Sequence, residues 1–418
     1  MIYYTLAVFS FSYCLTSNKH VVLGNFTKNE SERNLRGLKP LPELLNFIRI
    51  WGFAAGLGLS QTSQASHLAP PLPSACSQQL TGTAVLGGEI EIGPPMDTRQ
   101  VWRDLSQQAE LIYEMSPDRE NKGFKVFWAR GDKIPTALQE IGRLREITFR
   151  QVGEGSGQAY DNDKFDPHYW HLVAWDKSKE RIAGAYRLGV IKELVADQSS
   201  PLPYSLENVY TAQLFDFQSL LSEEFIGGAL EFGRSFVLPE YQRRSLALAA
   251  LWQGIGSILV SNPEFKYLIG PVSISGEFNP QSISIMLEFF KQHFSHPWAE
   301  YVKSYTPYSP PKPLKSKTLQ EINETAGSFQ ALKQLVQDSE GNPEKTPPPL
   351  LKIYADIGAK MLAQNHDQSF NSIDIMILVP LSEQSHEVLR AYLGDEGATN
   401  YLNFHSSMGG TQPPTEKD

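Results

Sequence analysis

One strand–helix segment restricts the folds open to this 418-residue chain. Residues 229–260, ALEFGRSFVLPEYQRRSLALAALWQGIGSILV, read as an apolar strand, a turn that begins at Pro239, and a helix that is apolar on almost every side. A helix without a polar face must be covered by protein all round. The segment therefore predicts a layered protein in which this strand and this helix both belong to the core.

The rest of the chain alternates between strand and helix patterns. Hydrophobic periodicity predicts strands at 124–130, 170–175, 181–191, 211–217, 265–274 and 372–381, and helices at 101–115, 134–152, 280–294, 317–337 and 350–364. The charged DKSKE turn between the second and third strands predicts a hairpin. The fold class that we expect is therefore α/β (α+β), with a partly antiparallel start.

The chain divides into four parts by composition. Residues 1–99 contain two apolar stretches. The first lacks the positive charges that precede a secretory signal, and the second is a little short to span a bilayer. We expect a poorly ordered extension that serves as a signal or faces the membrane. Residues 100–305 form the predicted core. Residues 306–405 combine proline-rich connectors with a C-terminal extension packing on that core, and residues 406–418 are a predicted flexible tail.

Charge and cysteine content exclude several functions. The formal net charge of -9 argues against a nucleic-acid partner, which would require a basic face. Cys14 and Cys76 form no CxxC, so a disulfide scaffold and a thiolate metal site are excluded, and a reducing compartment is favoured. His168 and His171 have the spacing of a helical metal pair but lie at the start of a strand without further ligands, so we expect no metal.

The turn before the apolar helix is a candidate phosphate site. A helix N-terminus presents unpaired N–H groups and a partial positive charge. Small residues there leave room for a pyrophosphate or a phosphopantetheine arm, and a solvated basic turn is the alternative for this segment alone. The candidate binding residues, in the spacing Gln-x-x-Ser-x-Ala, are Gln242, Arg243, Arg244, Ser245 and Ala247.

Glu231 and Arg234 are the charged residues of the apolar strand. Residues three apart face opposite sides of an ideal strand, but a bulge or a splay of the strand could turn both toward one cleft. There the carboxylate could accept a proton from an attacking ammonium. A structural ion pair with charges elsewhere, such as Arg187, is the alternative.

Taken together, these segments resemble the ornithine acyl-ACP N-acyltransferase and hemolysin family of the GNAT superfamily, which is related to the acyl-homoserine-lactone synthases. The resemblance covers roughly residues 122–405 and rests on EIGRLREITFRQVGEG, FDPHYWHLVAWD, IAGAYRLG, ALEFGRSFVLPEYQRRSLALAALWQGIG and YLIGPVSIS. It implies the GNAT-like acyl-CoA N-acyltransferase fold, a mixed twisted sheet flanked by helices, followed by a C-terminal extension of helices and strands.

The resemblance implies substrate-binding roles for polar residues in three segments. Arg145 and Phe149 form the Arg-x-x-x-Phe of the first helix, beside the acyl-chain and amine pocket. Asp163 and Asp166 form the Asp-x-x-Asp after the flexible loop, and Arg187 stands in the AYRL strand. The arginines would bind a carboxylate on the acceptor or hold the acidic loop.

The catalytic roles implied by the resemblance lie on the central strand. Glu231 and Arg234 match its Glu-x-x-Arg, and Glu231 would receive the amine proton. A backbone N–H near Ser235 would stabilise the oxyanion. Attack on the thioester would be direct, without an enzyme nucleophile.

The implied function is the transfer of a long-chain (3-hydroxy)acyl group from acyl carrier protein to the amine of an amino acid, of ornithine or glycine type, in aminolipid biosynthesis. No cofactor would be bound permanently, because the phosphopantetheine of acyl-ACP, or acyl-CoA, is a co-substrate. Acyl carrier protein would dock on a basic patch around Arg243 and Arg244. The expected location is cytoplasmic, with peripheral contact at the inner face of the membrane.

Departures from the family leave alternatives open. Ser245 stands where many acetyl-CoA-dependent relatives have glycine, which fits an acyl-ACP donor. Some relatives carry an additional O-acyltransferase domain with an His-x-x-x-x-Asp motif, and residues 1–100 contain no such motif. HLVAWD at 171–176 matches the motif, but we interpret this match as a coincidence. The alternatives are an acyl-homoserine-lactone-type synthase, an acyl-CoA-dependent GNAT enzyme, and a hemolysin-like lipid-binding protein without activity.

Overall fold

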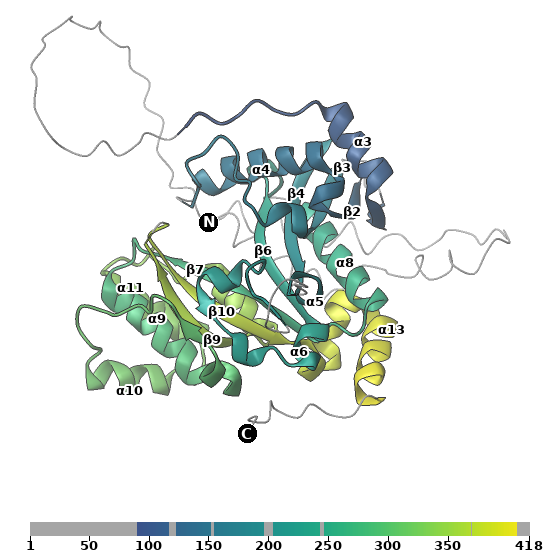
Figure 1. Ribbon diagram of the computed structural model, residues 1–418. Coiled ribbons are helices and arrows are strands. Elements are labelled where there is room, and N and C mark those ends of the chain that lie inside the picture. The colour runs from purple at the N-terminus through teal and green to yellow at the C-terminus, as the bar shows by residue number, and fades with distance from the viewer. Residues whose placement is uncertain are drawn as a thin grey trace, which may run out of the picture. The chain divides into compact units, whose positions relative to one another are not determined.

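The computed structural model describes residues 90–116, 123–151, 154–195, 204–242, 246–368 and 370–407, all within one compact unit (Figure 1). Our predictions for residues 1–89 and 408–418 lie outside this part of the chain. So do the predictions for Arg243, Arg244 and Ser245.

An eight-stranded mixed sheet forms the centre of the molecule, in the order β1-β2-β3-β4-β6-β7-β10-β9. Strands β6 and β7 run parallel, whereas the other neighbours in this sheet are antiparallel. The predicted mixed sheet is therefore confirmed. Its strands are β1 (Glu110–Glu114), β2 (Phe124–Arg130), β3 (Trp170–Asp176), β4 (Arg181–Val190), β6 (Ala229–Val237), β7 (Tyr267–Ser275), β9 (Lys360–Asp367) and β10 (Ser372–Pro380).

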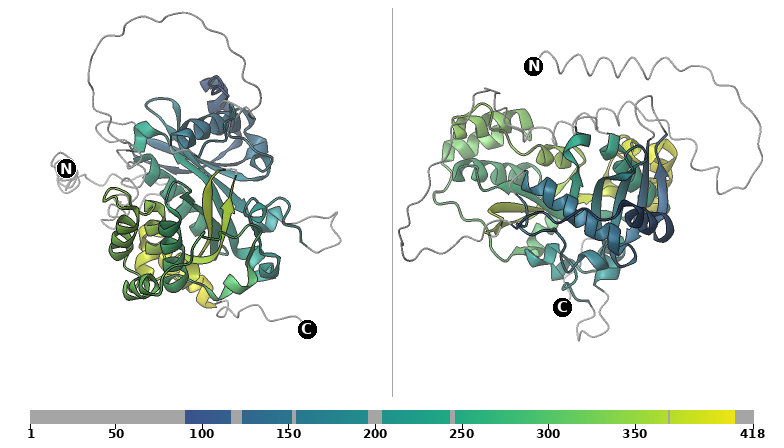
Figure 2. Two further views of the ribbon diagram at one scale, coloured as in Figure 1. Left: turned by 90° about the vertical axis from the view of Figure 1, so that its left-hand side faces the viewer. Right: turned by 90° about the horizontal axis from the view of Figure 1, so that it is seen from above.

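Helices flank this sheet. The apolar helix α8 lies against β1 to β4 and beside α13, which explains its lack of a polar face (Figure 1). Helices α9, α10 and α11 pack together toward the β9 edge, and the view from above separates these green helices from the yellow α13 (Figure 2, right). The longer helices are α3 (Thr98–Gln108), α4 (Pro135–Arg150), α8 (Leu246–Ser261), α9 (Pro280–His293), α10 (Ser316–Glu324), α11 (Phe329–Glu340), α12 (Pro349–Asp356) and α13 (His386–Ser407).

Smaller elements complete the chain. Short helices are α5 (Ile191–Leu194), α6 (Glu223–Gly228) and α7 (Pro239–Gln242). Strands β5 (Phe215–Asp216) and β8 (Lys303–Ser304) form a separate two-stranded sheet. The strand predicted at 211–217 is thus mostly wrong, because a 3-10 turn at Thr211–Gln213 precedes β5.

Three predicted helices differ from the structure, since two end earlier than their periodicity indicated and one is divided. The helix predicted at 101–115 ends at Gln108, and its last residues form β1. The helix predicted at 350–364 gives way to β9, because Gly358 adopts a φ of 82° that ends α12. The helix predicted at 317–337 is two helices, separated where Ala326 and Gly327 have φ values of 48° and 78°.

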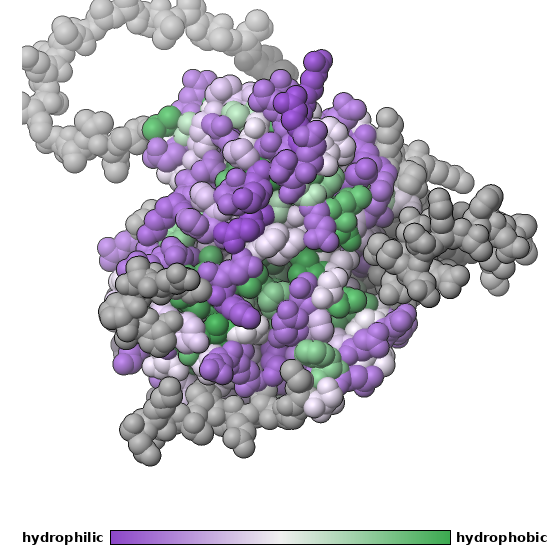
Figure 3. All heavy atoms as spheres, turned by 45° about the vertical axis from the view of Figure 1, so that its right-hand side comes forward, coloured by the Kyte–Doolittle hydropathy of each residue, from purple (hydrophilic) through white to green (hydrophobic). Residues whose placement is uncertain are grey.

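Apolar side chains divide between two cores, one on each face of the sheet. Along β10, for example, Ile373 and Ile375 belong to the larger core, whereas Met376 and Leu378 belong to the smaller one. On the face drawn in Figure 3 the surface is mainly hydrophilic, with apolar side chains emerging in patches across its middle. In the part of the chain that the structure describes, no helix combines the length and the hydrophobicity needed to cross a bilayer.

Candidate active site

The candidate site lies where β6 and β7 separate. The two strands are paired only from Ala229 to Glu231 on β6 and from Tyr267 to Ile269 on β7. Beyond this point a cavity of about 200 Å³ opens between them. Its charged lining residues are Glu154, Arg234, Asp367 and Asp374, and its hydroxyl-bearing ones are Tyr186, Tyr210, Ser235, Ser273, Tyr354 and Ser372.

A bulge at Arg234 turns β6 away from a regular course. The pairing of β6 with β4 passes from Gly233↔Arg187 to Phe236↔Ala185, which leaves one extra residue on β6. Arg234 accommodates it with a φ of 47°, which is uncommon for a residue other than glycine. One of the two distortions considered from the sequence, a bulge, is therefore present, and the Arg234 side chain lines the cavity.

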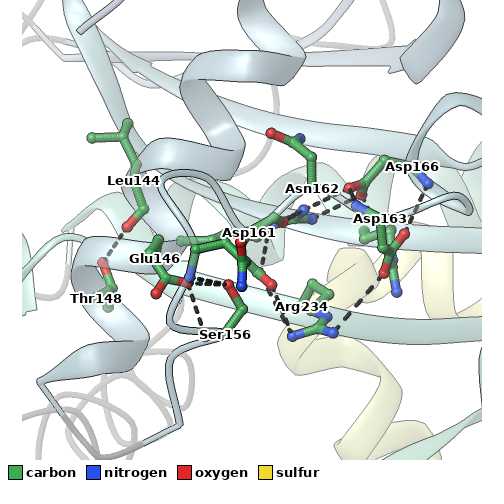
Figure 4. Close-up of polar contacts among 12 residues, drawn as sticks. Leu144, Glu146, Thr148, Ser156, Asp161, Asn162, Asp163, Asp166 and Arg234 are labelled. Carbon is green, nitrogen blue, oxygen red and sulfur yellow. Dashed lines mark hydrogen bonds and ion pairs between the residues drawn. The ribbon is translucent and has the colours of Figure 1, made fainter. Parts of the chain in front are cut away.

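Three arginines and three aspartates form an ion cluster behind the cavity, here called the arginine–aspartate cluster. Arg145 binds Asp166 at 2.7 Å, and Arg187 Nη1 lies 2.7 Å from Asp163 Oδ2 and 3.1 Å from Asp166 Oδ1. Arg234 Nη1 lies 3.3 Å from Asp161 Oδ1, and Nη2 lies 3.9 Å from Asp163 Oδ2. Figure 4 shows Arg234 between these two aspartates. The cluster comprises Arg145, Asp161, Asp163, Asp166, Arg187 and Arg234.

Opposite charge decides the ionisation of the buried pair at the centre of this cluster. Burial alone would raise the pKa of Asp166, but the charges of Arg145 and Arg187 outweigh it and hold this pKa far below its ordinary value. Burial alone would likewise lower the pKa of Arg187, and Asp166 and Asp163 instead raise it. Both groups are therefore charged at neutral pH, although each is only 1% exposed.

Aromatic rings enclose the two arginines nearest the cavity. The Arg187 guanidinium carbon lies 5.0 Å from the Tyr169 ring centre and 5.1 Å from that of Tyr210. The Arg234 guanidinium carbon lies 5.3 Å from the same Tyr210 ring. Cation–π contacts of this kind help to hold a guanidinium in one orientation.

Glu231 faces the smaller core instead of the cavity. It is 2% exposed, and it accepts hydrogen bonds from the Tyr169 hydroxyl and, at 2.5 Å each, from the Thr211 N–H and hydroxyl. The Tyr169 oxygen in turn accepts from the Tyr210 N–H at 2.8 Å. Glu231 thus fixes the turn that carries Tyr210, and it does not line the cavity in which we expected it.

The other predicted site residues separate into three groups. Phe149, Arg234 and Ser235 line the cavity. The predicted substrate-binding residues Arg145, Asp163, Asp166 and Arg187 belong to the cluster behind it and are not part of its lining. Gln242 donates to the Val237 carbonyl at 2.8 Å, and Ala247 is buried in the first turn of α8.

Several cavity residues were not anticipated. Glu154 follows α4, and its N–H donates to the Phe149 carbonyl. The loop beyond Glu154 is fixed by Glu146, which accepts hydrogen bonds from the Ser156 and Gly157 N–H groups, both at 2.9 Å (Figure 4). Asp374 is the one charged residue in the apolar sequence SIDIMILVPL. That isolated charge in a buried strand was a usable signal.

Burial and like charge raise the pKa values of these two carboxyl groups. The pKa of Glu154 is raised by burial and by the negative charge of Asp374, against the opposing effect of Arg234. The pKa of Asp374 is also raised, chiefly by burial. Burial raises the pKa of Tyr354 to about 12 and also raises that of Tyr210, so these phenols keep their protons at neutral pH.

Comparison with known proteins identifies similar sequences. The family model of the acetyltransferase (GNAT) domain matches residues 144–253, from α4 into α8. A glycine N(alpha)-acyltransferase of Phocaeicola vulgatus is 31% identical over 253 residues, which cover 58% of this chain and 72% of the relative. The glycine N(alpha)-acyltransferase of Bacteroides thetaiotaomicron is 33% identical, with 45% of this chain and 57% of the relative covered.

More distant relatives act on another amino acid. An L-ornithine N(alpha)-acyltransferase of Agrobacterium fabrum is 25% identical over 282 residues, which cover 65% of this chain and 86% of the relative. No solved structure matches the chain significantly.

Proposed function

The chain belongs to the GNAT family of N-acyltransferases that includes the glycine and L-ornithine N(alpha)-acyltransferases, and we propose that it transfers a long-chain acyl group to the α-amine of an amino acid. The observation that carries this proposal is the cavity between β6 and β7, which holds one lining arginine and several carboxyl groups. An α-amino acid has the complementary charges, a carboxylate for Arg234 and an ammonium for the carboxyl groups.

Arg234 is the proposed ligand of the acceptor's carboxylate. Its side chain is 16% exposed and lines the cavity, while Asp161 and the Tyr210 ring hold it from behind. In the described part of the chain its Nε–H has no hydrogen-bond partner, and Nη2 has only the 3.9 Å contact with Asp163. The Nη2 donors are thus available for a carboxylate.

The separated strands suit a phosphopantetheine arm. Residues 233–235 of β6 and 271–273 of β7 line the cavity beyond the last paired residues. The two strands do not form hydrogen bonds with each other here. An extended arm that contains amides can form these hydrogen bonds with the backbones of β6 and β7 instead. The N-terminus of α8 follows directly, where N–H groups favour a phosphate.

We favour acyl carrier protein as the donor, with acyl-CoA as the alternative that shares the same arm. Arg243 and Arg244 would form the docking patch for this acidic protein. The reaction would then take place in the cytoplasm, and its apolar product would pass into the adjacent membrane in aminolipid biosynthesis. A backbone N–H near Ser235 would stabilise the oxyanion of the tetrahedral intermediate.

Thiol release by the full-length chain tests this proposal. Long-chain acyl carrier protein and acyl-CoA are supplied in parallel, with glycine, L-ornithine, S-adenosylmethionine or no amine. We expect thiol release that requires glycine or ornithine. Release that requires S-adenosylmethionine would instead indicate a lactone-forming synthase, and no release by a folded protein that binds lipid would indicate a binding module.

A further inference from the structure

Asp374 is a buried carboxyl group that contacts the cavity. Alternation along β10 places it on the same face as Met376 and Leu378, which belong to the smaller core. It is 4% exposed, yet it lines the cavity together with Ser273 of β7 and Ser372. A charged group at such a position is rare in a strand whose other residues are apolar or uncharged.

Hydrogen bonds fix one oxygen of this carboxyl group and leave the other oxygen free to accept one. Asp374 Oδ1 accepts from the Ser273 hydroxyl at 2.6 Å and from the Ser372 hydroxyl at 3.4 Å. Within the part of the chain that the structure describes, Oδ2 accepts no hydrogen bond. Since Asp374 lines the cavity, this oxygen is left to accept a hydrogen bond from a cationic ligand there.

The groups around Asp374 come from four other segments. They are Arg234 on β6, Asp367 on β9, Glu154 after α4, and Tyr210, which directly precedes the 3-10 turn Thr211–Gln213. Burial and the charge of Asp367 raise the pKa of Asp374, while the serine hydrogen bonds and Arg234 oppose this rise. A carboxylate of raised basicity is better suited to accept a proton than an ordinary one.

We propose that Asp374 is a catalytic residue that binds the ammonium group of the acceptor and receives its proton, with Glu154 as the second carboxyl group of this subsite. This inference rests on the proposed function. One acceptor molecule would then span the cavity, with its carboxylate on Arg234 and its nitrogen at Asp374 Oδ2. Glu231, which is enclosed by Tyr169 and Thr211, has a positioning role instead.

The proton balance of the step is complete without a further reactant. Asp374 takes one proton from the ammonium, and the resulting amine attacks the thioester carbon to form the C–N bond. As the tetrahedral intermediate collapses, the C–S bond breaks, and the second nitrogen proton reaches the thiolate to give the thiol. The carboxyl group returns its proton to water when the amide leaves.

The Asp374→Asn variant tests the assignment through two acceptors. With the amino acid that the wild type uses, we expect kcat/KM at neutral pH to fall about 10²–10³-fold. The deficit should shrink as the pH approaches the pKa of the acceptor's amine, because the free amine needs no base. With aminooxyacetate, whose amine is already neutral at neutral pH and whose carboxylate is retained, the deficit should be less than about tenfold.

Controls separate this inference from the proposed function. The exposed Asp338→Asn on α11 is a matched change outside the cavity and should leave both activities unchanged. Circular dichroism confirms that each variant is folded. Wild-type kcat/KM in Asp374→Asn, or an equal loss with both acceptors at every pH, would overturn the role of Asp374 while the wild-type activity still supports the proposed function. A wild type that acylates no amine would overturn both.

Discussion

The Arg187→Met variant is expected to lose about 3–5 kcal/mol of unfolding free energy. Arg187 is 1% exposed and is bound to Asp163 and Asp166, the second of which is equally buried. Methionine keeps much of the side-chain volume but leaves these carboxylates with fewer positive partners. Chemical denaturation at neutral pH, followed by circular dichroism, measures the difference.

The loss should depend on pH in one direction. The pKa of Asp166 is lower in the folded protein than in the unfolded chain, where it has its ordinary value near 4. Ionised Asp166 therefore stabilises the fold at pH values above about 4, and this stabilisation is lost as the pH falls below that. The deficit of Arg187→Met should therefore be largest at neutral pH and should shrink below pH of about 4.

An exposed ion pair provides the control for this variant. Arg130 binds Glu193 at 2.7 Å, but its side chain is 31% exposed. We expect Arg130→Met to cost no more than about 1 kcal/mol. Similar losses for the two variants would show that the arginine–aspartate cluster is not the stabilising centre that its burial indicates.

The Arg234→Ala variant is expected to lower kcat/KM for the amino-acid acceptor roughly 10²-fold, mainly through KM. Arg234 is the cation that lines the cavity in the described part of the chain, and its loss removes the proposed partner of the acceptor's carboxylate. Arg234→Lys should recover only part of the activity, because an ammonium lacks the planar fork. Initial rates at varied acceptor concentration measure this change.

A substrate without the carboxylate distinguishes recognition from general damage. Methylamine is glycine without its carboxylate, so the wild type should use it poorly and Arg234→Ala should use it about as well as the wild type does. An equal loss with glycine and methylamine would mean that Arg234 only maintains the ion pairs with Asp161 and Asp163. Thermal unfolding of the variant provides the independent check on its fold.

Local patterns predicted much of the fold. The strands at 124–130 and 170–175 and the helix at 280–294 agree closely with β2, β3 and α9, since each has a clear period and turn residues at its ends. A bulge on β6 was also anticipated, but for a reason that does not hold, because Arg234 lines the cavity and Glu231 does not. The GNAT fold followed from several matching segments in order.

Tertiary pairing determined what the sequence could not predict. Asp374 contacts the cavity because β10 pairs with β7 along its whole length, a contact between segments about one hundred residues apart. The side of β6 on which Glu231 points was likewise misjudged, since its partners Tyr169 and Thr211 come from distant turns. Residue type therefore indicated the chemistry, while strand register decided which carboxyl group lies in the cavity.

The identity of the product tests the central claim most directly. The full-length chain is incubated with long-chain acyl carrier protein and ¹⁵N-labelled glycine or ornithine, and the acyl products are analysed by mass spectrometry. We expect a labelled N-acyl amino acid, with the mass of the acyl acid plus the amino acid less one water and the amide at the α-nitrogen. Free fatty acid as the only product, or an acyl group on oxygen, would contradict the assignment of an amino-acid N-acyltransferase.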